Sequence, residues 1–333
     1  MPIVSVVILN WNGQAFLEIF LPSVLASTYE NLKIYVADNA STDDSIAFLE
    51  KNYPTIEIIR NADNYGFAKG YNEALKNVVG DYYVLLNSDV EVHKNWVEPI
   101  IKLMEKDIQI AVCQPKIRAY DDKEKFEYAG AAGGFIDSLG YPFCRGRIFD
   151  ICETDKGQYD DVCPIFWASG AAMFVRAAVY KQMGGLDDDF FAHMEEIDLC
   201  WRIQQNGGII KYIGNSTVYH VGGATLSNIN PTKTFYNFRN SLLMLVKNIK
   251  SSKVWIILFI RLLMDGIAGL HFLIQGKWKH TLAIIKAHFS FYSLLPRYIN
   301  KEYKIRKEIK YYHIKSIVWN YFIRKKRIFK ELN

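Results

Sequence analysis

Ile3-Val4-Ser5-Val6-Val7-Ile8-Leu9-Asn10-Trp11-Asn12-Gly13 begins with a short β-branched block and ends in a polar loop that contains glycine. A continuous apolar run of this length is typical of a strand buried on both faces of a parallel sheet. The block has no basic segment before it and is too short for an export signal, so we expect a cytosolic N-terminus. We therefore interpret it as the first strand of an α/β fold.

The same succession of strand, polar loop and helix recurs along the first hundred residues. Further strand-like stretches cover residues 33–37, 56–60 and 82–86. The helix-like runs between them cover residues 14–27, 46–52 and 70–78. This alternation predicts βαβ units and a Rossmann-like, mostly parallel sheet.

Polar residues gather where the predicted strands end, at Asn10, Asp38, Asn64 and Asp89. Ligands of open α/β sheets bind in the crevice outside the carboxyl ends of the strands, so we expect these residues to share one crevice. The alternative is that Asn and Asp merely favour turns and helix caps. That alternative explains any single loop, but it explains Asp89 less well, because apolar, β-like residues follow it.

Composition excludes a disordered protein and shows a strong division of charge. The 333 residues are 50% hydrophobic and 23% charged, enough for one large domain or two smaller ones. Residues 1–229 hold 19 Lys and Arg against 31 Asp and Glu, whereas residues 230–333 hold 21 against 4. The overall net charge of +5 thus combines an acidic body with a basic tail, which indicates an anionic partner for the tail.

The five cysteines form no CxxC pair and are odd in number, so we expect reduced thiols and no disulfide framework. A zinc site among the three cysteines between residues 144 and 163 has no support from their spacing.

Eight motifs in order resemble family 2 glycosyltransferases, most closely the rhamnosyltransferase-like branch. They are Val4–Gly13, 38–43, 64–72, 86–89, 169–171, 185–187, 195–202 and 219–223. The resemblance covers about residues 3–225. It implies a GT-A fold over residues 1–228, a nucleotide-sugar donor, a divalent metal and inversion at the anomeric carbon.

Asp89 is the candidate metal ligand. Its carboxylate suits Mg²⁺ or Mn²⁺, with the donor diphosphate completing the coordination shell. The family's DxD element reads Asn87-Ser88-Asp89 here, so the first acid is absent, and the resemblance assigns Asn87 and Ser88 to the donor side. His220 matches the family position that supplies a further ligand; the alternative is a strand-end histidine that caps local backbone.

The other strand-end loops are candidates for binding the nucleotide. Asp38 and Asn39 suit recognition of a pyrimidine edge, and Asn10 or Asn12 a base or ribose. Glycines would let the backbone approach the ligand, and asparagines would hold ribose or diphosphate: Gly66, Gly70, Asn64 and Asn72. No GxGxxG follows the first strand, which disfavours a dinucleotide site.

Three acids lie at the start of a predicted helix over residues 196–205. Inverting transfer needs one carboxylate to accept the proton of the acceptor hydroxyl. The family base matches Glu196, although the family has Asp there, and Glu195 is the second candidate. Acids in a first turn also simply favour the helix dipole, an explanation that suits Asp198. Glycoside hydrolysis by an acid pair would explain neither the strand-end loops nor Asp89.

We expect the acceptor to bind near an irregular excursion over residues 121–163, which is rich in Gly, Tyr and Asp. The residues assigned to the acceptor side from the adjoining motifs are Trp167, Ser169, Gly170 and Asp187.

The basic tail over residues 229–333 is predicted to be helical. Residues 254–274 are long enough to span a membrane, but they contain Arg261, Asp265 and His271, which are costly in hydrocarbon. Arg261 and Asp265 are four residues apart and would pair on one helical face. Residues 278–295 have a basic-polar stripe and an apolar side, which favours a helix in a membrane interface. Packing on the catalytic domain or on a dimer partner is the alternative, and nucleic acid is disfavoured by the acidic body.

Together these patterns predict an inverting, metal-dependent glycosyltransferase at the cytosolic membrane face. Its donor would be a dTDP- or UDP-linked sugar, and its acceptor a saccharide, lipid-linked or close to the membrane, in the synthesis of a surface polysaccharide. A nucleotide-sugar-binding protein of the same fold without turnover is the alternative, because the first acid is missing and Glu196 replaces Asp.

Overall fold

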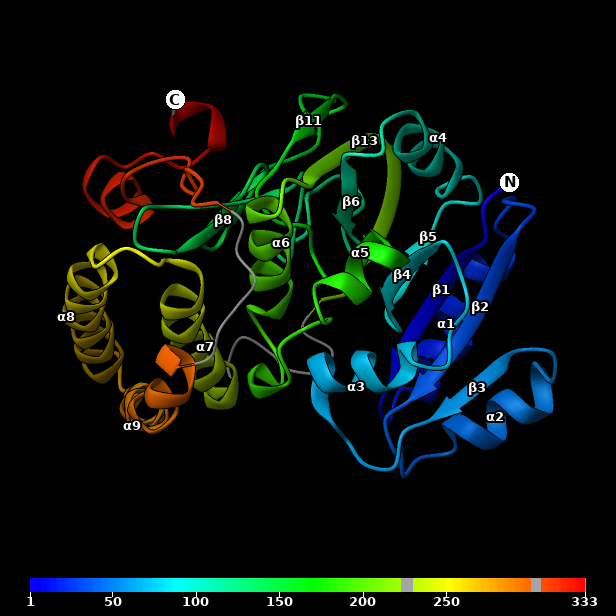
Figure 1. Ribbon diagram of the computed structural model, residues 1–333, viewed down its shortest axis with the longest axis horizontal. Helices are drawn as coiled ribbons and strands as arrows, with labels where there is room; N and C mark the ends of the chain where they lie inside the picture. Colours follow the sequence, from blue (N-terminus) through cyan, green and yellow to red (C-terminus); the bar gives the residue numbers. More distant parts are fainter. Residues whose placement is uncertain (223–229, 301–306, 333) are drawn as a thin grey trace.

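The computed structural model describes residues 1–222, 230–300 and 307–332. Figure 1 shows one large twisted sheet with helices on both faces, a group of three helices beside it, and a C-terminal segment that lies near β8. The predicted boundary at residues 228 and 229 falls outside the described residues. The predicted α/β fold with a C-terminal helical extension is confirmed.

Within the described residues the main sheet has nine strands, in the order β11-β13-β6-β12-β4-β1-β2-β3 with β5 beside β13. The strands are β1 (Val4–Asn10), β2 (Leu32–Asp38), β3 (Glu57–Arg60), β4 (Tyr82–Asn87), β5 (Val90–Val92), β6 (Ile110–Ala119), β11 (Val162–Pro164), β12 (Ala172–Arg176) and β13 (Ile209–His220). Strands β1, β2, β3, β4, β6 and β13 share one direction, whereas β5, β11 and β12 oppose it. The sheet is therefore mostly parallel.

Helices cover both faces of this sheet, and each face has its own apolar core. On one face α1 (Gln14–Leu25), α2 (Ser45–Asn52) and α4 (Glu98–Lys106) pack against the buried side chains of the strands. The other face carries α3 (Gly66–Leu75), α5 (Ala177–Gln182) and α6 (Glu195–Gln205). Because β1 and β4 are buried on both faces, their sequences are continuous apolar runs without alternation.

Two local predictions need correction. Helix α3 begins at Gly66, four residues before the predicted start, because the Asn64 side chain and the distant Phe191 carbonyl accept from its first backbone N–H groups. The excursion over residues 121–163 is not wholly irregular: it contains a second, antiparallel sheet in the order β10-β9-β8-β7. Its strands are β7 (Gly134–Ile136), β8 (Pro142–Cys144), β9 (Arg147–Ile148) and β10 (Ile151–Cys152). Strands of two or three residues are too short to show periodicity in a sequence.

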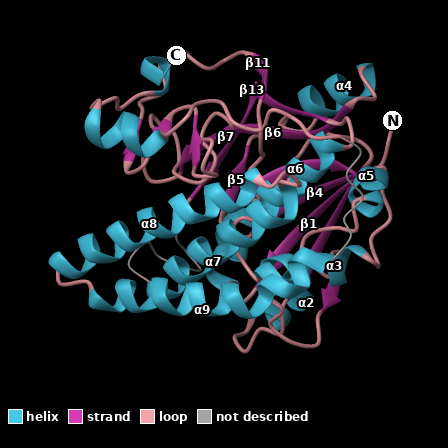
Figure 2. Ribbon diagram, turned by 60° about the vertical axis from the view of Figure 1, so that its left-hand side comes forward, coloured by secondary structure: helices cyan, strands magenta, loops and turns pink. Residues whose placement is uncertain are grey.

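The basic tail forms α7 (Pro231–Asn248), α8 (Lys253–Ile274) and α9 (Trp278–Asn300). Figure 2 shows the three helices side by side, and Figure 1 shows α8 at the outer edge of the molecule. The following segment returns to the second sheet, where Ser138 N donates to Ile314 O over 3.1 Å. It ends in two short turns of helix, Trp319–Ile323 and Phe329–Leu332. Within the described residues, α8 is the one helix whose length and composition would allow it to cross a membrane.

Candidate functional site

The carboxyl ends of the parallel strands place the predicted site residues along one edge of the sheet. Asn10 ends β1 directly opposite Asp38, which ends β2. Asn87 ends β4 and lies beside Leu9 of β1. His220 ends β13 at the same edge, paired with Val90 of β5. Residues far apart in sequence thus meet here.

Two loops of this edge are bound to one another through Asn10 and Asn12. Asn10 Nδ2 donates to Asp38 Oδ1 over 3.1 Å and to Ser41 Oγ over 3.2 Å. Asn12 Oδ1 accepts from Thr42 N over 2.7 Å. The Asn10 Oδ1 atom is buried without a hydrogen-bond partner among the described residues, so it offers a free acceptor at this point.

Asn39 organises the next loop. Its Nδ2 donates to Gly66 O over 2.8 Å, and its Oδ1 accepts from Asn61 Nδ2 over 2.9 Å. A Cβ on Gly70 would lie 2.9 Å from Asn39 Nδ2, so glycine is needed there to admit the Asn39 side chain. Gly66 has a φ of +71°, in the left-handed region that favours glycine. The two glycines therefore shape the loop around Asn39.

Asn72 is used by the fold rather than presented to a ligand. Its Nδ2 donates to Leu186 O over 2.9 Å and to Asp188 Oδ1 over 2.6 Å. Its Oδ1 accepts from Leu186 N over 3.0 Å and from the Tyr180 hydroxyl over 2.7 Å. These four bonds fill the capacity of the amide, so the side chain has none left for ribose or diphosphate.

Asp89 and His220 converge at the end of β4. Asp89 Oδ1 lies 3.2 Å from His220 Nε2, and both side chains are buried. Asn87 Nδ2 lies 3.3 Å from the same imidazole nitrogen. Ser88 Oγ lies close to Gly13 of the first loop, 3.4 Å from where a Cβ would be. Residues 87–89 thus lie next to both His220 and the β1 loop.

Glu127 lies on the other side of the His220 ring, with Oε2 3.2 Å from Nδ1. Burial alone would lower the pKa of His220, but the Asp89 and Glu127 carboxylates raise it to about 10. Burial would likewise raise the pKa of Asp89, yet the charge and hydrogen bond of His220 hold it below its ordinary value. The pair is a site that attracts positive charge.

A carboxylate oxygen and an imidazole nitrogen this close fit a divalent ion that takes two protein ligands. Among the described residues no group of three or more His, Cys, Asp or Glu side chains is arranged to hold a metal ion. Asp89 and His220 would therefore leave positions open for the oxygens of a diphosphate. Glu127 would act through His220, since a carboxylate on the second ring nitrogen fixes the orientation of a ligating histidine.

Glu127→Gln is expected to weaken Mn²⁺ binding about 10–100-fold, because the amide orients and polarises the imidazole less well. Electron paramagnetic resonance of free Mn²⁺ with UDP present measures the affinity. Glu124→Gln, three residues away and exposed, is the matched control and should leave the affinity unchanged. Equal affinity in both variants would show that Glu127 does not orient His220.

Glu195 and Glu196 begin α6. Glu195 is buried, whereas Glu196 is partly exposed, and each has an Oε2 atom without a hydrogen-bond partner among the described residues. Burial raises the pKa of both carboxyl groups. The pKa of Glu196 rises to about 7, although hydrogen bonding from the Gly170 backbone lowers it. The neighbouring Glu196 charge raises the pKa of Glu195 further. Glu196 therefore combines partial exposure of its side chain with a pKa suited to a proton acceptor near neutral pH.

The loop before α6 has a strained backbone. Phe191, His193 and Met194 have φ values of 61°, 71° and 76°, which are unfavourable for these residues. Asn240 of α7 holds this loop, because its Nδ2 donates to the carbonyls of residues 190, 192 and 193 over 2.8–2.9 Å. The C-terminal extension thus positions the residues that precede Glu195 and Glu196.

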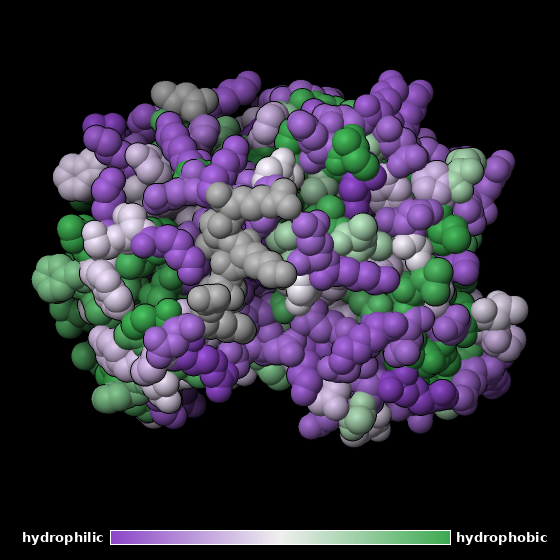
Figure 3. All heavy atoms as spheres, viewed as in Figure 1, coloured by the Kyte–Doolittle hydropathy of each residue, from purple (hydrophilic) through white to green (hydrophobic). Residues whose placement is uncertain are grey.

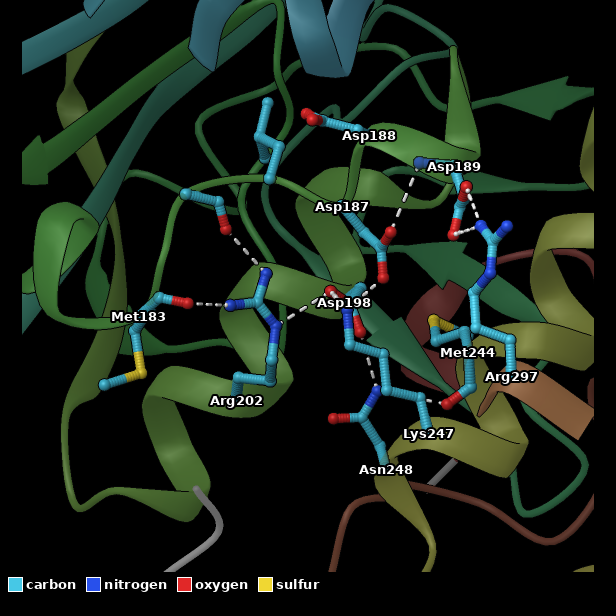
Figure 4. Close-up of polar contacts among 12 residues, drawn as sticks. Met183, Asp187, Asp188, Asp189, Asp198, Arg202, Met244, Lys247, Asn248 and Arg297 are labelled. Carbon is cyan, nitrogen blue, oxygen red and sulfur yellow. Dashed lines mark hydrogen bonds and ion pairs between the residues drawn. The ribbon is translucent and has the colours of Figure 1, made fainter. Parts of the chain in front are cut away.

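A buried cluster of charges fastens α7 to α6 (Figure 4). Lys247 Nζ lies 2.5 Å from Asp187 Oδ2 and 2.8 Å from Asp198 Oδ2. Asp198 also accepts from Arg202 Nε and Asn248 Nδ2, each over 2.8 Å. The Asp198 carboxylate is therefore occupied by this cluster, and the Asp187 carboxylate pairs with Lys247 of α7.

Of the other residues assigned to the acceptor side, two stabilise the fold and one contacts the candidate site. Trp167 is buried against Gly134 and donates from Nε1 to Phe135 O over 3.0 Å. Ser169 Oγ donates to Ala129 O over 2.5 Å. Gly170 alone of these contacts a candidate catalytic group, through its backbone and Glu196. Sequence reasoning missed Glu127, Asn240 and Lys247, which no motif marks.

Comparison with known proteins adds to this geometry. The family model described as glycosyl transferase family 2 matches residues 5–178. An N-acetylglucosaminyl-diphospho-decaprenol L-rhamnosyltransferase of Mycobacterium tuberculosis is 24% identical over 236 residues, which are 66% of this chain and 76% of that protein. An uncharacterized glycosyltransferase of Haemophilus influenzae is 24% identical over 243 residues, 71% of this chain and 69% of that protein.

Solved structures share the fold at low sequence identity. Staphylococcus aureus TarS residues 1–349, in complex with UDP-GlcNAc, superimposes with a TM-score of 0.57 at 14% identity, over 89% of this chain and 82% of that one. The mannosyltransferase PcManGT from Pyrobaculum calidifontis, with GDP-Man and Mn²⁺, gives 0.54 at 14% identity, over 89% and 79%. The fold is therefore GT-A. With the family model matching more than half of its length, the chain belongs to glycosyl transferase family 2.

Proposed function

We propose that this glycosyltransferase is inverting and metal-dependent, and that it transfers a sugar from a nucleoside diphosphate to a lipid-linked saccharide. The observation that carries the proposal is the short connection between base and metal site. The Gly170 backbone hydrogen-bonds to Glu196, and the next carbonyl, that of Ala171, accepts from Asn87 N over 3.1 Å. Glu196 and the Asn87-Ser88-Asp89 motif are thus held together by two consecutive residues.

In the proposed reaction Glu196 accepts the proton of the acceptor hydroxyl. The acceptor oxygen forms its bond to the anomeric carbon as the bond from that carbon to the diphosphate oxygen breaks, and the nucleoside diphosphate leaves. Asp89 and His220 would hold the divalent ion, which supplies positive charge to the leaving diphosphate when bound. Glu127 keeps the His220 ring in place, and Asn240 keeps the loop before Glu196 in place.

The donor would be a dTDP- or UDP-linked sugar, with Asp38, Asn39 and Asn10 near the base and ribose. Support for a rhamnosyl donor and a lipid diphosphate acceptor comes from the name of the mycobacterial relative. Support for a UDP donor comes from TarS, which was solved with UDP-GlcNAc. Such an acceptor would place the enzyme on the inner face of the cell membrane, in polysaccharide synthesis.

Donor-dependent product formation tests the proposal. Purified protein is incubated with Mn²⁺, a short-chain prenyl-diphospho-GlcNAc and, separately, dTDP-rhamnose, UDP-GlcNAc or UDP-galactose, and products are measured by mass spectrometry. A product whose anomeric configuration, read by NMR, is inverted relative to the donor supports it. The other candidate function is that of a nucleotide-sugar-binding protein without turnover. Asn87 favours it, because this residue stands where the family's DxD motif has its first acid. Nucleotide binding without transfer or sugar hydrolysis for any donor would support that candidate.

Activity is expected to fall as the pH is lowered through about 7, because burial raises the pKa of Glu196 to that value. The carboxylate is the active form of a base, so kcat/KM should be full above this pH and decrease about tenfold for each further unit below it. The pH profile measured at subsaturating acceptor reports this group. A profile that stays flat down to pH 5 would contradict Glu196 as the base.

A further inference from the structure

Helix α8 has two opposite faces of different character. Its inner face carries Val254, Leu258, Arg261, Asp265 and Gly269, all buried. Its outer face carries side chains at the spacing of one helical stripe, each 56–78% exposed: Ile256, Phe259, Leu263, Ile267, Leu270 and Ile274. Figure 3 shows apolar side chains at the edge of the molecule where Figure 1 places α8. An apolar stripe along more than five turns of helix indicates an interaction surface.

The contacts of the inner face with the rest of the protein are incompatible with a position of α8 across a membrane. Arg261 Nη1 donates to Leu139 O and Nη2 to Ser241 Oγ, each over 2.8 Å, and its guanidinium lies 3.9 Å from the centre of the Tyr141 ring. Asp265 accepts from the Tyr141 hydroxyl over 3.3 Å and lies 3.1 Å from His288 Nε2. A spanning α8 would lose these partners and carry two charges into hydrocarbon.

The surroundings of the stripe fit an anionic lipid surface. Exposed Lys253 and Trp255 begin α8, and exposed Lys277, Trp278 and Lys279 follow its end. Tryptophan and lysine at the ends of an apolar segment are typical of membrane interfaces. The one acid of the α8–α9 hairpin is Asp265, which is buried. The tail as a whole has 21 basic against 4 acidic residues, so lipid fits the charge better than a second copy of the same basic surface.

We infer that α8 lies in the plane of the membrane interface, with its outer stripe inserted among the lipids and its inner face on the catalytic domain. This extends the proposed membrane location, and binding does not depend on transfer. The tail then binds by apolar insertion and not by its basic charge alone. Binding should therefore survive salt that screens surface charge.

Vesicle sedimentation of the full chain tests the surface. With three parts phosphatidylcholine to one part phosphatidylglycerol, the wild type should stay bound at about 0.5 M NaCl. Leu263→Ser with Ile267→Ser should lower the partition coefficient at least about tenfold. The matched control is Val79→Ser with Ile108→Ser, two apolar side chains outside the tail that are more exposed than Leu263 and Ile267, and it should bind like the wild type. Circular dichroism and a UDP thermal shift check that each variant is folded.

The orientation has its own test. Cysteines introduced at Ser252 and Gln275, at the two ends of α8, should both react with an impermeant maleimide added outside the vesicles. Labelling of only one would show a spanning helix and overturn the inference. The inference would also be overturned if the variant Leu263→Ser with Ile267→Ser bound vesicles as the wild type does. A third contrary result would be a wild type that binds no vesicles but forms a dimer that these two changes dissociate. Glu196→Gln should bind vesicles normally, so failure of the proposed chemistry and failure of this surface are distinguishable.

Discussion

Replacing Glu196 with Gln should lower kcat by about 10²–10⁴-fold, because the amide cannot accept the proton of the acceptor hydroxyl. The donor site should be unaffected, since the Gln oxygen can still accept from the Gly170 backbone. Single-turnover transfer from the identified donor measures the loss, and calorimetry with UDP and Mn²⁺ measures donor-site binding.

Glu195→Gln is the matched control for this experiment. Burial and the Glu196 charge raise the pKa of Glu195 well above its ordinary value, which favours the neutral form that Gln imitates in size and charge. Transfer should therefore fall much less than in Glu196→Gln. If Glu195→Gln abolishes transfer while Glu196→Gln keeps it, the two roles are exchanged. If neither loses activity, the base lies outside α6.

The sheet and its ligand edge were predictable because their signals are local. The apolar run of β1 and the polar loop after it are contiguous in the sequence, and the same is true of β2 and β4. Parallel strands then bring their carboxyl ends together whatever the loop contents. Asn10, Asp38 and Asp89 therefore came to one edge without any knowledge of side-chain positions.

Roles that depend on a distant partner were not predictable. Asn72 has the residue type of a ligand contact, yet its bonds to Leu186 and Asp188 occupy it. Asn240 acts on a loop about 50 residues away in sequence. Glu127 comes from the loop between β6 and β7, which has no periodic pattern, and only the fold brings it to His220. The Arg261 and Asp265 pair on α8 is local, at a spacing of four, and the structure confirms it at 3.7 Å.

The extension and the candidate site meet in the Asp187, Asp198 and Lys247 cluster, so we expect stability to depend on this cluster. Lys247→Met should lower the free energy of unfolding by about 3–5 kcal/mol, because it leaves two buried carboxylates with too few positive partners. Urea unfolding followed by tryptophan fluorescence measures this change. Lys76→Met is the control, because its exposed pair with Glu73 contributes at most about 0.5 kcal/mol.

A second substitution separates lost charge balance from lost packing. Asp187→Asn removes one of the two carboxylates while its Oδ1 can still accept from Asp189 N. In Lys247→Met with Asp187→Asn the total loss should therefore be smaller than the sum of the two single losses, with a coupling of about 1–3 kcal/mol. Additive losses would show that Lys247 acts through its methylene packing alone. Because α7 also carries Asn240, Lys247→Met should lower kcat in the folded protein as well, which links the stability of the extension to the position of Glu196.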